Sequence, residues 1–155
     1  MFSRYFGQNL DRPFRTVPKV WGREEWFFNS EAYCMKKLVV NQRGRVSEHY
    51  HKNKHETFTL LNGLLYMDLS GNAGEGHMIM RPGHTLPLIP GTKHSFTGLT
   101  DCVIIESSSY HEDEDSYRTP GKESRVLDVE EFRDFLISLR YVSELSPEEL
   151  SLLEI

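Results

Sequence analysis

Four side chains with metal-binding chemistry occur at a spacing that can bring them to one point. His49 and His51 are two residues apart, Glu56 follows, and His94 comes much later in the chain. Residues i and i+2 of an extended strand project to the same side, so a carboxylate past a short bend and a histidine from a distant strand can join the pair. Three imidazoles and one carboxylate suit Zn, Mn, Fe, Ni or Co rather than a Cys site or an all-oxygen Ca site. The pattern predicts one divalent transition metal.

Two charged residues, Lys36 and Glu106, lie inside apolar strand-like runs. Strand alternation gives each of them mostly apolar companions, which indicates inward faces close to the predicted metal. A charge buried there needs a partner or a function, because an unpaired buried charge is costly. Two interpretations stay open: a catalytic pair, or an ion pair that only fixes the register of the strands.

A scaffold of short strands is expected to position these side chains. Between Trp21 and Ser109 short apolar runs are separated by turn signals, with little helical periodicity. Asn62-Gly63 between two such runs predicts a two-residue hairpin, since a type I′ turn needs positive φ at both central residues. The pattern is typical of an antiparallel sandwich or barrel, whose closure removes exposed edges. The expected strands are 26–29, 33–40, 47–51, 57–61, 64–69, 77–80, 85–89, 94–97 and 102–107.

The two ends of the chain differ from this central part. Residues 1–20 read as an irregular arm or edge segment, before a barrel over 21–118 and a helical tail over 128–155. Apolar residues at helical spacing over 128–140, with Asp128 and Glu131 as a capping box, predict one helix. Ser146-Pro147 predicts the start of a second. We expect a single domain whose tail packs on the barrel or on the partner in a homodimer.

The composition of the chain limits the kinds of molecule that it could bind. The chain has 155 residues, a net charge of −5 and two cysteines, Cys34 and Cys102. The acidic balance and the lack of a long basic run argue against nucleic acid and anionic membranes. Neither a membrane-spanning stretch nor a signal-peptide pattern is evident, which predicts a cytoplasmic protein with buried, reduced thiols. His55, His77, His84 and His111 fit no ligand position and are expected to be surface or hydrogen-bonded histidines.

The spacing of the predicted ligands resembles the two motifs of the cupin superfamily. The first motif, a Gly, His-x-His, Glu and a second Gly, matches residues 44–63, and the second, with Pro-x-Gly-x-x-His at its centre, matches 83–98. The gap before His49 is one residue short, and Ile89 and Gly98 replace a Pro and an Asn, but no ligand is lost. The resemblance implies an all-β cupin double-stranded β-helix, a jelly-roll barrel that holds one metal.

A closer resemblance is to the cupin domain of type II mannose-6-phosphate isomerases. It is carried by Trp21-Gly22, by the strand 33–40, and by the Glu, Ser-rich and acidic segment that ends at Arg118. This implies a sugar or sugar phosphate as substrate. Lys54 and Arg118, which flank the ligand loops, could bind a phosphate or carboxylate, or they could form a solvated rim. Tyr117 is a further candidate for substrate contact.

These observations lead to three hypotheses. The first is metal-dependent aldose–ketose isomerisation, with Glu106 as a base whose pKa burial raises and Lys36 as proton donor or electrostatic partner. The second is a non-haem Fe(II) dioxygenase, because three histidines and a glutamate also hold iron with open positions. The third is a carbohydrate-binding module without turnover. The fold alone does not choose among them.

Overall fold

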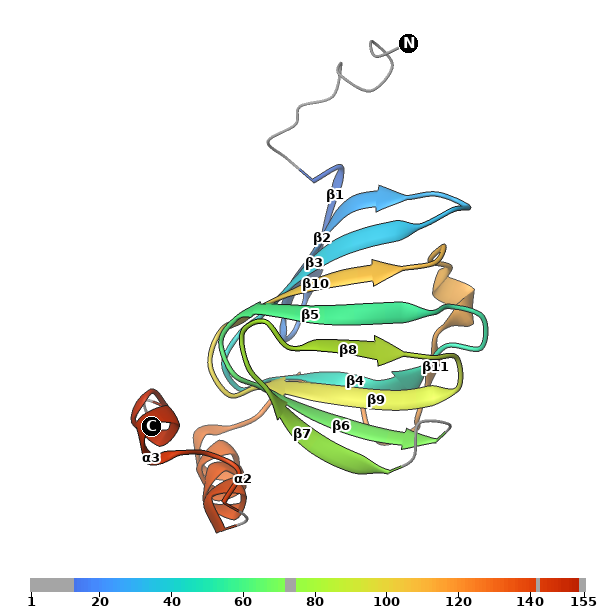
Figure 1. The fold of residues 1–155 in the computed structure, drawn as a ribbon. Coiled ribbons are helices and arrows are strands. Elements are labelled where there is room, and N and C mark those ends of the chain that lie inside the picture. Colours follow the sequence, from blue (N-terminus) through green and yellow to red (C-terminus); the bar gives the residue numbers. More distant parts are fainter. Residues whose placement is uncertain (1–12, 72–74, 142, 154–155) are drawn as a thin grey trace.

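The structure, a computed structural model, describes residues 13–71, 75–141 and 143–153, and shows two antiparallel sheets facing each other with helices at the C-terminal end (Figure 1). The strands are β1 Arg15–Lys19, β2 Gly22–Asn29, β3 Cys34–Val40, β4 Gly44–Tyr50, β5 Glu56–Asn62, β6 Leu65–Gly71, β7 Gly76–Met80, β8 Thr85–Leu88, β9 Thr92–Gly98, β10 Cys102–Ser108, β11 Tyr117–Arg118 and β12 Arg125–Val126. The helical elements are the 3₁₀ turn η1 Asp113–Asp115 and the helices α2 Val129–Tyr141 and α3 Pro147–Ser151.

Consecutive strands mostly lie in opposite sheets. One sheet has the order β1-β2-β3-β10-β5-β8, and the other has the order β11-β4-β9-β6-β7, with β12 also pairing with β4. Between β3 and β10 the chain therefore changes sheet at every connection except that from β6 to β7. This is the winding of a double-stranded β-helix, so the predicted all-β jelly-roll fold is confirmed.

The core lies between the two sheets. Burial alternates along β3, where Cys34, Lys36, Leu38 and Val40 are buried. A period of two is what a strand with one face on the core requires. Leu38 packs in one cluster with residues of the facing sheet, including Phe96. Burying each such side chain contributes about 1.5–3 kcal/mol, which makes this layer the main support for the polar site beside it.

The hairpin predicted at Asn62-Gly63 is wrong. β5 pairs with β10 and β8, whereas β6 pairs with β9 and β7, so the two runs belong to different sheets. Gly63 has φ +90°, but Asn62 is not among the residues with positive φ, as a type I′ turn would need. A Cβ built on Gly63 would lie 2.2 Å from the Asp101 carbonyl oxygen. Gly63 is thus needed because the chain passes close to the backbone of Asp101 where it crosses from one sheet to the other.

The described part of the predicted N-terminal arm forms a regular strand. Residues 1–12 lie outside the described residues, but β1 pairs along its whole length with β2, from Arg15 opposite Trp26 to Lys19 opposite Gly22. All nine expected strands are present as β2 to β10. β1 lies at the edge of its sheet, which agrees with the edge segment expected for this part of the chain and not with an irregular arm. β1 extends the sheet that forms one wall of the cavity.

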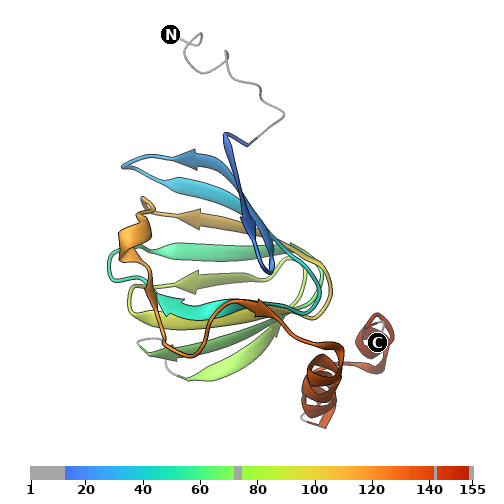
Figure 2. The same ribbon diagram turned by 180° about the vertical axis from the view of Figure 1, so that it is seen from behind.

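The C-terminal helices pack on the outside of the barrel, at the opposite end of the sheets from η1 (Figure 2). Phe132 and Leu136 of α2 join Tyr66 and Ile79 of β6 and β7 in a second apolar cluster. Asp128 accepts the Glu131 backbone N–H at 2.8 Å, although the Glu131 carboxylate pairs with Arg125 rather than completing the predicted capping box. The helix at Pro147 is confirmed, with a full capping box between Ser146 and Glu149. The tail thus supports the barrel from outside the cavity.

Both cysteines are buried free thiols, as predicted. Burial raises the pKa of Cys102 to about 12, so its thiol stays protonated. Among the described residues, no helix has the length and apolar character needed to cross a membrane. The homodimer and the cytoplasmic location stay predictions.

Candidate metal centre

The structure brings the four predicted ligands together at one end of the barrel. His49 lies on β4 and is directly opposite His94 on β9, while His51 follows β4 and Glu56 begins β5. Their ligand atoms all lie within 4.8 Å of one another. Strand alternation puts the first two histidines on one side, and the β4–β9 register adds the third. The four side chains could hold a metal ion.

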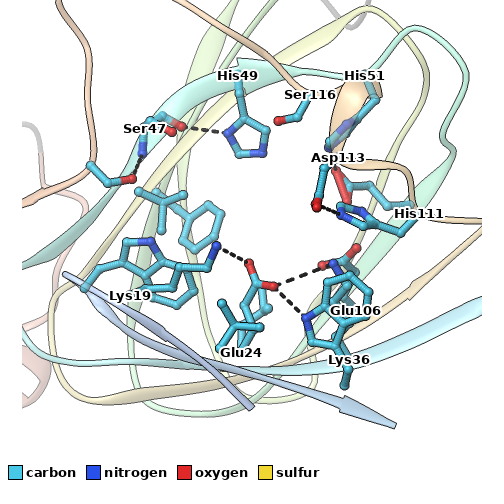
Figure 3. A pocket seen from close by; sticks show the side chains of 18 of the residues that line it. Lys19, Glu24, Lys36, Ser47, His49, His51, Glu106, His111, Asp113 and Ser116 are labelled. Atoms are coloured by element: carbon cyan, nitrogen blue, oxygen red, sulfur yellow. Dashed lines mark hydrogen bonds and ion pairs between the residues drawn. The ribbon is translucent and has the colours of Figure 1, made fainter. Parts of the chain in front are cut away.

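Each imidazole is oriented through its Nδ1 atom. His49 Nδ1 lies 2.7 Å from the Ser47 carbonyl oxygen, a contact visible in Figure 3, and His94 Nδ1 lies 3.0 Å from that of Thr92. His51 Nδ1 lies 2.8 Å from the Asp115 carbonyl oxygen. A carbonyl only accepts hydrogen bonds, so each Nδ1 carries the proton and each Nε2 presents a lone pair. This arrangement is typical of histidines that bind metals.

The surroundings of His49 and Glu56 shift their pKa values towards the protonation states that bind metal. Burial, followed by the neighbouring His94, lowers the pKa of His49 to about 3, so this imidazole is neutral at physiological pH. Burial alone would raise the pKa of Glu56, whereas the ammonium of Lys54 beside it lowers that pKa. The pKa of Glu56 is therefore well below its usual value, and its carboxylate is ionised.

Two buried atoms of the cluster are unsatisfied in the part of the chain that the structure describes. Glu56 Oε1 and His94 Nε2 have no directed hydrogen-bond partner, although they lie 3.2 Å apart. Leaving such a group unpaired costs about 1–3 kcal/mol. A cation between them would satisfy both lone pairs, and a set of three nitrogens and one oxygen fits a borderline divalent metal.

Lys54 lies directly behind this cluster rather than on a solvated rim. The side chain is buried, and its Nζ is 2.9 Å from Glu56 Oε2, 2.7 Å from Glu106 Oε1 and 3.2 Å from His111 Nδ1. Burial alone would lower the pKa of Lys54, but the carboxylates of Glu106 and Glu56 raise it, so the ammonium stays charged. Lys54 also lines the cavity, so its predicted contact with a substrate stays a prediction.

Lys36 and Glu106 share the inward face that the alternation predicts, since they are directly opposite each other in the β3–β10 register. They are not each other's ion-pair partner, however. Lys36 Nζ is 3.7 Å from Glu24 Oε2 and 3.8 Å from the centre of the Trp26 ring, whereas Glu106 pairs with Lys54. Figure 3 shows Glu24, Lys36 and Glu106 on the same wall of the cavity. The ion pair expected as a register device is therefore absent between these two residues.

A cavity of about 600 Å³ opens onto the centre, lined by the metal cluster, Lys36 and Glu106. Arg118 of β11 also lines it and is directly opposite His49 in register, so both side chains face the same way. Tyr117, the other substrate candidate, is stacked on Tyr50 with ring centres 5.2 Å apart and is not among the lining residues. Its position gives no support for a substrate contact.

Sequence reasoning missed four residues of the site: Glu24, Trp26, His111 and Asp115. Glu24 and Trp26 line the cavity from β2, and the Trp26 Nε1–H donates to Glu24 Oε2 at 2.8 Å. Their i, i+2 spacing on a strand was the available signal. His111 directly precedes the acidic run 112–115 and Asp115 ends it, and nothing in the sequence shows that this segment turns inward.

Asp115 anchors the ligand-bearing loop between β4 and β5. Its carboxylate accepts the backbone N–H groups of Lys52, Asn53 and Lys54 at 2.9–3.2 Å. Burial alone would raise the pKa of Asp115, but these N–H donors lower it, so the carboxyl is ionised. Its own carbonyl also accepts from His51. One residue thus positions both a metal ligand and the loop that leads to Glu56.

Replacing Asp115 by alanine is expected to destabilise the protein by about 2–4 kcal/mol, since three N–H groups lose their acceptor. Urea denaturation followed by circular dichroism measures the change. As a matched control, Asp113→Ala removes a carboxylate that is 80% exposed and should cost far less. Equal stability of the two variants would contradict the anchoring role.

The double-stranded β-helix and its cluster of three histidines and one glutamate define a cupin-type fold with a candidate metal centre. No protein-family model matches the chain. It is 26% identical over 129 residues to a D-lyxose/D-mannose isomerase of Thermosediminibacter oceani, covering 68% of this chain and 71% of that protein.

Solved structures share the fold at low identity. KdgF from a Halomonas species superposes with a TM-score of 0.53 at 15% identity, over 59% of this chain and 81% of that one. The capsular polysaccharide assembling protein CapF of Staphylococcus aureus gives a TM-score of 0.59 at 18% identity, over 75% of this chain. This chain spans only 34% of CapF.

Proposed function

We propose that the protein is a metal-dependent sugar isomerase that interconverts an aldose and a ketose, with a sugar or sugar phosphate as substrate. The observation that carries the proposal is the joining of Glu106 to the metal cluster through one ammonium group. Lys54 Nζ is 2.7 Å from Glu106 Oε1 and 2.9 Å from Glu56 Oε2. A buried carboxylate therefore lies next to the site where a substrate's oxygens would bind. The similarity to a D-lyxose/D-mannose isomerase supports a carbohydrate as substrate.

The reaction requires a proton to move between neighbouring carbons while a carbonyl and a hydroxyl exchange roles. His49, His51, Glu56 and His94 would hold the metal. A divalent ion bound there would stabilise negative charge that develops on the sugar's oxygens.

Glu106 is our candidate for the base. Within the described residues its Oε2 atom has no hydrogen-bond partner, whereas Oε1 accepts from Lys54. Oε2 is thus available to take the proton from one carbon of the sugar and return it to the next, as general base and then acid.

We also assign substrate-binding roles to two positively charged side chains, those of Lys36 and Arg118. Lys36, held by Glu24 and the face of Trp26, would donate to a sugar oxygen across the cavity. Arg118, beside His49 at the mouth, would contact the far end of the sugar or its phosphate.

The test is turnover of a defined sugar panel. Protein stripped of metal and reloaded separately with Mn²⁺, Zn²⁺, Co²⁺, Ni²⁺ or Fe²⁺ is incubated with D-lyxose, D-mannose and mannose 6-phosphate, and products are followed by NMR. We expect aldose–ketose conversion of at least one sugar that stops on chelation. Oxygen consumption by the iron form without isomerisation would favour the dioxygenase hypothesis. Saturable sugar binding without turnover, persisting after metal removal, would favour the binding module.

A further inference from the structure

We infer that His111, which the predicted ligand and catalytic sets omit, is a positioning residue that fixes the ammonium of Lys54 between the two carboxylates of the site. This inference rests on the proposed function for its kinetic consequence only. The contact itself is a geometric property of the protein. His111 comes from the segment after β10, and Figure 3 shows its ring among the side chains that surround the cavity.

The Lys54 ammonium can donate three hydrogen bonds, and His111 accepts the one that the two carboxylates do not. An ammonium group has three N–H donors and no acceptor. Glu106 Oε1 at 2.7 Å and Glu56 Oε2 at 2.9 Å take two of them, and His111 Nδ1 at 3.2 Å takes the third. With all three donors used, the ammonium is fixed in direction as well as in place. Removing His111 Nδ1 would leave one donor of a buried cation without a partner.

The same contacts fix the protonation pattern of the His111 ring. Because Lys54 can only donate, His111 Nδ1 must accept, and the ring proton must therefore be on Nε2. His111 Nε2 lies 3.0 Å from the Asp113 carboxylate, which accepts that proton. The ring thus connects an exposed carboxylate to a buried ammonium in a defined orientation.

The rest of the protein holds His111 rigidly enough for this role. Its backbone N–H donates to Asn29 Oδ1 at 3.0 Å, and the Asn29 amide donates back to the His111 carbonyl at 3.1 Å. Its ring meets the Trp26 ring edge-on, with centroids 5.0 Å apart and an interplanar angle of 87°. These constraints come from β2, whereas Lys54 lies in the loop between β4 and β5. A surface histidine without a function does not require this number of fixed contacts.

The consequence is control over the distance between the base and the metal centre. Lys54 is the shared partner of Glu56, a metal ligand, and Glu106, the candidate base. If the ammonium moves, the two carboxylates lose their common partner and Glu106 can turn away from the substrate. Misplacement of a reacting group by about 1 Å can reduce a rate by about 100-fold.

Two substitutions separate the hydrogen bond from packing. His111→Asn keeps an acceptor close to the position of Nδ1 but removes the ring, whereas His111→Phe keeps the ring against Trp26 and removes the acceptor. We expect kcat to fall by roughly 10–100-fold in His111→Phe with KM nearly unchanged, and to be largely restored in His111→Asn. His84→Phe, at an exposed position in the β7–β8 turn, is the control and should keep its kcat.

A second measurement does not depend on turnover. In metal-free protein with ¹⁵N-labelled lysine, a buried and fully hydrogen-bonded ammonium gives a proton signal protected from exchange with water. Lys54→Arg and Lys36→Arg assign the signal by its loss in one and its persistence in the other. We expect it to be lost in His111→Phe and retained in His111→Asn.

The opposite order, with His111→Phe normal and His111→Asn defective in both kinetics and the ammonium signal, would show that only packing matters and would overturn the inference. An unchanged signal in both variants would do the same. If the wild-type protein isomerises no sugar of the panel, the proposed function fails, and the ammonium signal still decides the role of His111.

Discussion

Replacing His94 by alanine is expected to abolish stable metal binding. His94 is almost completely buried, and its Nε2 is one of the two cluster atoms left unsatisfied among the described residues. Loss of a partner one step outside a metal's ligands already costs about 10–100-fold in affinity, so loss of a ligand should cost at least about 100-fold. Elemental analysis after dialysis of metal-loaded protein measures the ratio of metal to chain. We expect a value near one per wild-type chain and near zero for the variant.

The control for this experiment is His77→Ala. His77 stacks on Tyr66 and pairs with Glu144 on the outer side of the barrel, so its loss should leave metal content unchanged. If His94→Ala retained a full equivalent of metal, the four side chains would not be the binding site. Circular dichroism of both variants shows whether the fold is retained, which a change in metal content alone does not establish.

Replacing Glu106 by glutamine is expected to remove most of the activity while metal stays bound. The two side chains have the same shape, and the amide oxygen can still accept from Lys54, but glutamine cannot take a proton from carbon. General acid–base catalysis contributes about 100- to 10,000-fold to a rate, and kcat should fall by that factor. The measurement is kcat with the best substrate of the panel, together with metal content.

Glu25→Gln provides the matched control, because Glu25 is next to Glu24 on β2 but on the opposite face, paired with Lys37. It should keep both activity and metal. Unchanged turnover in Glu106→Gln would exclude Glu106 as the base. A loss of metal in that variant would instead point to a structural effect transmitted through Lys54 to Glu56.

The clustering of the four candidate ligands could be predicted, because it depends on strand alternation and on the spacing of two sequence motifs. A period of two along β4 places His49 and His51 together, and the motif spacing adds Glu56 and His94. Short strands separated by turn signals predicted an antiparallel sandwich or barrel, and the resemblance to the cupin motifs specified the jelly roll. The inward placement of Lys36 and Glu106 followed from strand alternation, since a mostly apolar strand face indicates the core.

The errors occurred where contacts join segments distant in sequence. Lys54 reads as a loop lysine, but Asp115 holds the three backbone N–H groups around it and turns the loop inward. The Asn62-Gly63 turn was recognised, yet local turn chemistry does not specify which strands pair after it. Which strands pair depends on which face of each strand is buried, and a single dipeptide carries no information about that.

The alternation of strands between the two sheets has a consequence for how the native state forms. β4 and β9 supply His49 and His94 as direct neighbours, but four strands separate them along the chain. Contacts of such long sequence separation form slowly, because much loop entropy must be lost before they contribute. A metal ion bound by these four side chains would therefore reinforce the assembled barrel rather than nucleate its folding.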